Sequence, residues 1–116
     1  MRDERQFLED IVTAAETISN EMAGITYKHF LQNQTLQRSV LFSFAVIGEA
    51  ANKLLKTTRE AYPEIEWSSI IAFRNIIVHA YFSLNLKTVF SAATRRVLPL
   101  AEQIRAIIRH DFPDED

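Results

Sequence analysis

Apolar residues recur at three- and four-residue intervals through most of the chain, and this periodicity constrains the fold more than any other feature. Positions three or four apart lie on one face of an α-helix. The chain has only 2 glycines and 3 prolines in 116 residues, and tight turns and β-hairpins depend on those residues. The pattern therefore predicts an all-α protein. The first apolar stripe consists of Phe7, Leu8, Ile11, Ala14, Ala15, Ile18 and Met22.

Four main helices are expected, together with a short extra one. The first covers residues 3–22 and ends before Gly24, which suits a left-handed cap. A short helical piece follows at residues 26–31. The second main helix covers residues 35–56, and the Thr35 hydroxyl is a suitable N-cap.

The second half of the chain supplies the other two main helices. A connector with room for one helical turn leads to the third, which begins near Ser68 or Ser69. Asn85 is a good N-cap for the last helix. Pro99 falls inside that helix, where a proline costs about 3 kcal/mol, so we expect a kink or a break into two stacked segments. These helices predict a single domain over residues 1–116, an up-and-down four-helix bundle.

The second main helix is apolar nearly all round. One apolar face consists of Leu36, Val40, Phe44, Ile47, Ala51 and Leu54. The other face consists of Leu41, Phe42, Ala45 and Val46. A helix of this kind needs a partner on each side. It either lines a dimer interface or is the central helix of the bundle.

The composition narrows the class of protein. The chain has no cysteine, which excludes disulfides and thiolate metal sites and fits a reducing cytoplasm. Its net charge of -2 does not by itself indicate a nucleic-acid binder. The opening segment MRDERQFLED is too charged for a secretion signal, and the apolar run at residues 40–51 is too short and interrupted to span a bilayer. We expect a cytoplasmic protein that does not enter membranes.

The segment RNIIVHAY, residues 74–81, places polar side chains on an otherwise apolar helix. On a regular helix Arg74 and Tyr81 share one face, while Asn75 and His79 share another face about 100° away. His79 is therefore placed to contact Asn75. It reaches Arg74 only if the helix loosens near Tyr81 or a second copy of the chain supplies the other group.

Such a pair of side chains suits metal-free RNA cleavage. The imidazole of His79 can move the proton of a ribose 2′-hydroxyl at neutral pH, and the Arg74 guanidinium can hold the phosphate. Tyr81 can donate a hydrogen bond or stack on a base. The sequence has no cluster of carboxylates or histidines at the spacing of metal ligands and no glycine-rich phosphate loop, so no metal or cofactor is expected. The alternative is a surface cation, a hydrogen-bonded histidine and a half-buried tyrosine.

The same segment resembles the RxxxxHxY motif of the HEPN superfamily, and of its HepT-like branch in particular. Two longer blocks, QRSVLFSFAVIGEAANKL and YPEIEWSSIIAFRNIIVHAYF, are similar to the best-marked blocks of that branch. The similarity in helix order covers nearly the whole chain, although the first and last helices match only in pattern. The motif alone is moderately specific, and its combination with IGEA and IEW is strong.

The resemblance implies a small HEPN domain that forms a homodimer and acts as the toxin of a toxin–antitoxin pair. Such proteins resemble metal-independent endoribonucleases, in which the motif arginine and histidine of two protomers form the RNA-cleaving cleft. Arg74 would then be the phosphate-binding cation, His79 the general acid–base and Asn75 an orienting residue. The partner would be a minimal nucleotidyltransferase, the MNT antitoxin, which transfers AMP to Tyr81.

Two residues of the IGEA segment are candidates for supporting the site. Glu49 either orients Arg74 or His79 from the neighbouring helix, or forms a surface pair with Lys53 one turn away. Gly48 permits close approach of another helix.

Outside the motif, the sequence leaves further readings open. Trp67 is expected to anchor the start of the third main helix. Arg95 and Arg96 either widen an RNA-binding surface or lie on an ordinary exposed face. For the whole chain, the alternative function is a non-catalytic accessory subunit that presents a substrate to a nucleotidyltransferase.

Overall fold

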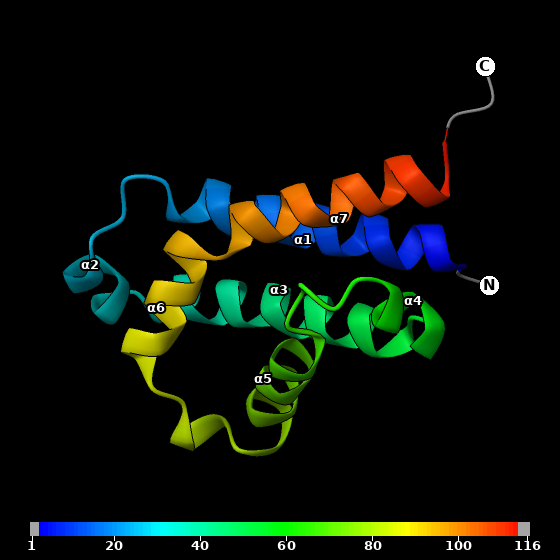
Figure 1. Ribbon diagram of the computed structural model, residues 1–116. Helices are drawn as coiled ribbons and strands as arrows, with labels where there is room; N and C mark the ends of the chain where they lie inside the picture. The colour runs from blue at the N-terminus through cyan, green and yellow to red at the C-terminus, as the bar shows by residue number, and fades with distance from the viewer. Residues whose placement is uncertain (1–2, 114–116) are drawn as a thin grey trace.

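The computed structural model describes residues 3–113, which are helical and contain no β-strand (Figure 1). The predicted all-α helical bundle is confirmed, including the short extra helix and the helical turn in the connector. Residues 1–2 and 114–116 of the predicted domain lie outside the described part. The elements are α1 (Glu4–Met22), α2 (Tyr27–Gln32), α3 (Gln34–Lys53), α4 (Lys56–Ala61), α5 (Trp67–His79), the 3-10 turn η1 (Tyr81–Ser83), α6 (Leu86–Arg95) and α7 (Val97–Asp111).

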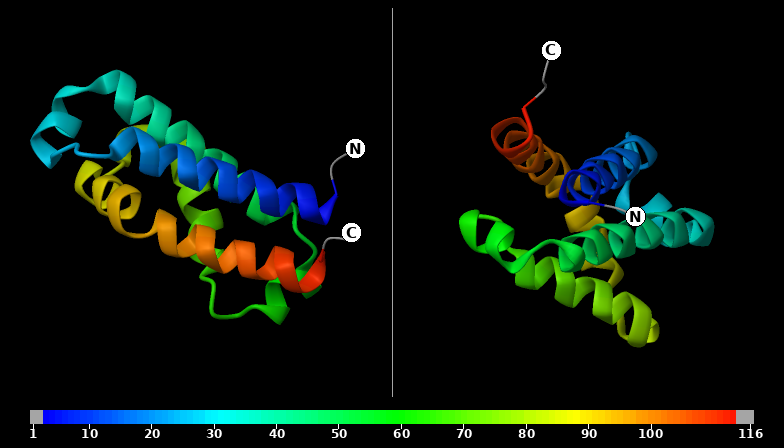
Figure 2. Two further views of the ribbon diagram at one scale, coloured as in Figure 1. Left: turned by 90° about the horizontal axis from the view of Figure 1, so that it is seen from above. Right: turned by 90° about the vertical axis from the view of Figure 1, so that its right-hand side faces the viewer.

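The long helices are arranged so that α1 packs against both α3 and α7, and α3 packs in turn against α5 (Figure 2). The core lies mainly between α1, α3 and α7. Helix α5 packs almost entirely against α3, and only Trp67 among its residues is fully buried. Helix α5 therefore lies at the periphery of the bundle with its outer face exposed. No helix in the described part of the chain is long and apolar enough to cross a membrane.

Helix α3 buries most of both its apolar faces, as a central helix does. Leu41 is buried, and Ala45 and Val46 are half-buried. Phe42 on the same side remains 71% exposed. One apolar part of α3 thus stays uncovered in the single chain.

Two helix starts differ from the sequence-based prediction. Helix α3 begins at Gln34, because the side chain of Asn33 accepts a hydrogen bond of 3.0 Å from the Leu36 N–H and caps the helix in place of Thr35. Helix α5 begins at Trp67, one residue before the predicted Ser68. The buried Trp67 indole donates a hydrogen bond of 3.0 Å to the Tyr62 carbonyl. This bond holds the start of α5 and confirms Trp67 as its anchor.

Helix α3 ends at Lys53, three residues earlier than predicted, because the backbone turns out of the helix at Leu54. The next N–H, that of Leu55, donates to the Glu4 carboxylate at 2.8 Å, and the Thr58 hydroxyl donates to the same carboxylate at 2.7 Å. The start of α1 thus holds the start of α4. At the other end of α1, Gly24 adopts a φ of 73°, which confirms the predicted left-handed cap.

The predicted break near Pro99 is confirmed. Helix α6 ends at Arg95 and α7 begins at Val97, so Pro99 lies in the first turn of α7, where its missing N–H removes no helical hydrogen bond. Asn85 caps α6 as expected, and its side chain accepts hydrogen bonds from the N–H groups of Lys87 at 2.9 Å and Thr88 at 3.3 Å.

A side-chain contact joins the connector before α5 to the end of α7. The Tyr62 hydroxyl donates a hydrogen bond of 2.7 Å to Asp111, and this bond is the main reason why the pKa of Tyr62 is raised to about 12. The pKa of Asp111 is lowered, first by its hydrogen bond with His110 and then by the one from Tyr62. His110 is an exposed residue in this contact, remote from the motif in sequence.

Candidate active site

The motif helix closely approaches α3 where Gly48 faces Arg74. A Cβ atom placed on Gly48 would collide with the Cβ of Arg74, and would stand 2.9 Å from the Arg74 Cγ and 3.1 Å from the Ile70 carbonyl oxygen. Contacts that short force a neighbour to move. The predicted close approach at Gly48 is confirmed. It places the Cβ of Arg74 directly against the backbone of α3.

The guanidinium of Arg74 is held by two side chains. Its Nη2 lies 2.9 Å from the Glu49 Oε2, and its Nη1 donates a hydrogen bond of 2.8 Å to the Asn75 Oδ1. The Glu49 Oε1 also lies 3.9 Å from the Lys53 Nζ. Glu49 therefore makes both of the contacts that the sequence allowed, and the one with Arg74 is the shorter. The hydrogen bond of Asn75 in residues 3–113 is thus with Arg74 and not with His79.

His79 is the last residue of α5, and its side chain is exposed. Five residues separate it from Arg74, which places the two side chains about 140° apart around the helix. The imidazole and the guanidinium of one chain therefore lie on different faces of α5.

The helix does not continue to Tyr81, so the predicted face shared by Arg74 and Tyr81 does not form. Ala80 leaves the helical conformation with a φ of -141°, and η1 follows. The Tyr81 side chain is 42% exposed, and its ring meets that of Phe82 edge-on at 5.6 Å between centroids. The three motif side chains thus have different surroundings. Arg74 lies against α3, His79 is exposed at the last residue of α5, and Tyr81 lies in the turn η1.

A shallow groove of about 470 Å³ lies beside Arg74, between α5, α3 and α1. Exposed apolar side chains lie in and beside this groove. Val78 in its lining is 51% exposed. Phe42 lies one helical turn before the lining residues Ala45 and Val46, on the same side of α3. This Arg74 face thus combines uncovered apolar surface with a charged group formed by Arg74, Glu49 and Lys53. Its lining is formed by Phe7, Asp10, Ala45, Val46, Glu49, Ala50, Lys53, Arg74 and Val78.

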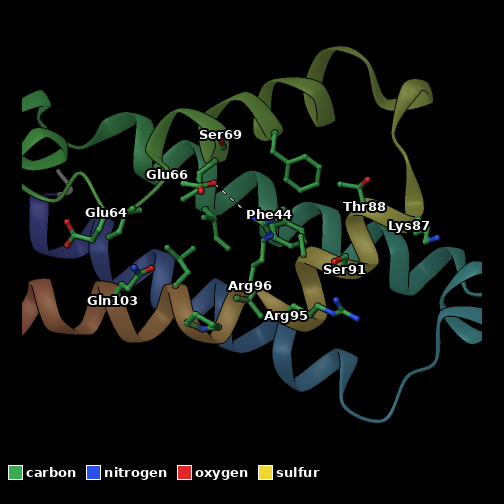
Figure 3. A pocket seen from close by; sticks show the side chains of 18 residues that line it. Phe44, Glu64, Glu66, Ser69, Lys87, Thr88, Ser91, Arg95, Arg96 and Gln103 are labelled. Atoms are coloured by element: carbon green, nitrogen blue, oxygen red, sulfur yellow. Dashed lines mark ion pairs between the residues drawn. The ribbon is translucent and has the colours of Figure 1, made fainter.

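A larger groove of about 760 Å³ lies on the other side of α5, between that helix and α6–α7 (Figure 3). It contains none of the motif residues Arg74, His79 and Tyr81. Size alone therefore does not mark the candidate site. Among residues 3–113, no group of three or more His, Cys, Asp or Glu side chains is placed to hold a metal ion.

Comparison with known proteins gives one family. The family described as ribonuclease HepT-like matches residues 7–107. A "Putative RNase" of Caldanaerobacter subterraneus is 27% identical and covers 96% of this chain and 99% of its own length. A "Putative RNase" of Methanocaldococcus jannaschii is 31% identical over 93% of each chain.

A third relative carries the family's own name. The "Probable ribonuclease HepT" of Thermococcus cleftensis is 29% identical and covers 77% of this chain and 81% of its own length. No solved structure gives a significant match.

Proposed function

Because the chain belongs to the HepT-like ribonuclease family of the HEPN superfamily, we propose that it is a metal-independent endoribonuclease whose cleft forms between two copies. The observation that carries this proposal is the separation of Arg74 from His79 around α5. One chain presents each group on its own face, so a second copy is needed to bring a guanidinium and an imidazole to one phosphate.

The Arg74 face is the surface we propose for pairing. It carries the exposed apolar side chains of Phe42 and Val78, whose burial is worth about 1.5–3 kcal/mol each. A second copy that covers this face across a two-fold axis contacts it with the same residues. His79 lies at the end of α5 beside this face, so the partner's imidazole can approach Arg74 across the axis.

In the proposed mechanism, His79 removes the proton from a ribose 2′-hydroxyl. The 2′-oxygen then attacks the adjacent phosphorus, the bond to the 5′-oxygen breaks, and the leaving 5′-oxygen takes up a proton. Arg74 binds the phosphate and stabilises the charge that grows on its oxygens. Glu49 and Asn75 position the guanidinium before RNA binds, because both already contact it.

Replacing Glu49 by alanine tests this positioning role. Both side chains are partly exposed, 45% for Glu49 and 27% for Arg74. We expect the free energy of unfolding to fall by no more than about 1 kcal/mol. Cleavage should fall about ten- to a hundredfold, because a misplaced catalytic group loses rate steeply. The matched control is Lys53→Ala, which removes the other Glu49 contact. A rise in cleavage by Glu49→Ala would show instead that the carboxylate competes with phosphate.

We further propose that the protein is the toxin of a toxin–antitoxin pair, and that a minimal nucleotidyltransferase neutralises it by transferring AMP to Tyr81. The exposed Tyr81 lies just beyond the end of α5 and two residues after His79, so its hydroxyl is accessible to a partner enzyme. The transferred phosphate is an anion beside the place where the RNA phosphate binds, and it opposes that binding by charge and by bulk.

This proposal is tested with purified protein and RNA in the presence of a chelator. We expect cleavage without added metal. Incubation with the co-expressed nucleotidyltransferase and ATP should add AMP to Tyr81, seen by mass spectrometry, and should abolish cleavage. The control is Tyr81→Phe, which should cleave RNA and resist the modification. Cleavage that stops on chelation would contradict metal independence, and a modified yet active protein would contradict neutralisation through Tyr81.

A second candidate is a non-catalytic subunit that presents a substrate to a nucleotidyltransferase. It is favoured by the contact of Glu49 with Arg74, since a carboxylate already compensates that cation. Growth arrest on expression of this chain alone, relieved by His79→Ala, is expected of the ribonuclease and not of the accessory subunit.

A further inference from the structure

We propose that Phe82 and the basic face of α6 bind the unpaired RNA that extends from the cleavage site. This inference rests on the proposed ribonuclease function and deepens it, because it assigns a base-stacking platform and a phosphate track to residues outside the motif. It also restricts the substrate to RNA whose bases are free to leave a duplex near the cut.

Phe82 is the most exposed large apolar side chain described, with a relative exposure of 100%. Its ring and the Tyr81 ring meet in a T-shaped arrangement with an interplanar angle of 89°, and this contact leaves Phe82 fully exposed to solvent. Phe82 lies three residues after His79, in the turn that leaves the end of α5 (Figure 1). An aromatic ring on which a base stacks strengthens binding about five- to 150-fold and tolerates any base.

The first helix after this turn carries a basic face. Lys87, Ser91 and Arg95 follow at four-residue intervals, so they share one side of α6 that lines the larger groove (Figure 3). Helix α6 has no acidic residue. Within residues 3–113, neither Lys87 nor Arg95 forms an ion pair. Arg95 lies eight positions after Lys87, a rise of about 12 Å along the helix, which is enough for more than one phosphate.

The charge of the groove changes from positive to negative along its length, and this gives the bound RNA strand a direction. Lys87 and Arg95 lie at one end, while Glu64 and Glu66 lie at the other, and Glu66 pairs with Arg96 at 3.8 Å (Figure 3). Phosphates are favoured at the uncompensated cations and opposed by the two carboxylates. A strand that starts at Phe82 therefore follows α6 and ends near Arg96.

The uncompensated cations favour RNA over a protein partner for this surface. An apolar protein segment would gain from burying Phe82 but would leave Lys87 and Arg95 without counter-charges, which is unfavourable. A polyanion with stackable bases satisfies both features. A duplex does not, because its bases are already stacked on one another.

The test measures binding of RNA that cannot be cut, a single strand with 2′-deoxy sugars at the cleavage positions, by fluorescence anisotropy. Phe82→Leu keeps an apolar side chain and loses the ring, so we expect Kd to rise about tenfold or more. Phe82→Trp should keep the wild-type Kd. For a perfect duplex of the same length, Phe82→Leu and wild type should bind equally.

The phosphate track is tested by salt dependence. The double variant Lys87→Gln/Arg95→Gln should lower the slope of log Kd against log salt by about one to two units. The control Lys56→Gln/Arg109→Gln removes the same charge from exposed positions on α4 and α7, and it should keep the wild-type slope.

Three results would overturn the inference. Two of them are unchanged affinity of Phe82→Leu for the single strand and equal slopes for the two double variants. The other is a shift of Phe82→Leu from dimer to monomer in sedimentation with unchanged RNA affinity of the remaining dimer, which would make Phe82 a subunit contact. The binding assay does not depend on cleavage, because the probe is not cut. The proposed function therefore fails separately, if the wild type binds RNA tightly but never cleaves it.

Discussion

Replacement of His79 by alanine is expected to reduce RNA cleavage about 10²–10⁴-fold, the range that a general acid–base supplies. The exposed imidazole is not part of the core and forms no hydrogen bond within residues 3–113, so its loss should leave the free energy of unfolding almost unchanged. Cleavage of a labelled RNA under single-turnover conditions measures the first quantity, and urea unfolding followed by circular dichroism measures the second.

The same variant shows whether the cleft is shared between chains. Arg74→Ala and His79→Ala are each expected to be inactive alone. In an equal mixture of the two, about half of the pairs contain one chain of each kind and regain one intact pairing of Arg74 with His79, which predicts about one quarter of the wild-type rate. A mixture that stays inactive after subunit exchange would mean that both groups act within one chain, and the composite cleft would be excluded.

Substitution of Gly48 by alanine is expected to destabilise the fold by about 1–3 kcal/mol, the usual cost of overpacking a close contact. The new Cβ collides with the Cβ of Arg74 and crowds the Ile70 carbonyl, so α5 must move away from α3. This displacement shifts the Arg74 guanidinium, and a shift of about 1 Å is enough to reduce cleavage about a hundredfold. Urea unfolding and cleavage by the folded variant measure the two effects.

Gly24 provides the matched control. A Cβ there meets no atom within 4 Å, and the cost of alanine arises from the φ of 73°, at about 1–2 kcal/mol. Gly24→Ala should therefore lose stability comparable to that of Gly48→Ala while keeping wild-type cleavage. If both variants cleave equally well, the close approach of α3 and α5 does not position the site.

The helices could be predicted from the sequence because their signals are local. The apolar period predicted all four main helices, and Pro99 predicted the break before α7. The errors lie at the ends, where several residues compete for one role. Asn33 and Thr35 are both good caps, and the hydrogen bond to Leu36 decides for Asn33. The early end of α3 depends on Glu4, which is 51 residues away from Leu55 in sequence.

The candidate site could be predicted in part. For Glu49 the sequence left open a contact with the motif helix or with Lys53, and for Gly48 it predicted close approach of another helix; both residues contact Arg74. The partner of Asn75 could not be predicted, because it is the guanidinium of the preceding residue, and adjacent residues do not share a face of a helix. The exposure of Phe82 was missed as well. Its signal was an aromatic residue placed directly after the motif, where the helical period stops.

Helix α5 packs on the edge of the core: only Trp67 is fully buried, and the partly buried residues that pack against the core are Ile70, Ile71, Phe73 and Ile77. Most substitutions along its outer face therefore leave the rest of the bundle intact. Stability and recognition are separable in this architecture: selection can rework the chemistry that α5 displays while α1, α3 and α7 preserve the scaffold.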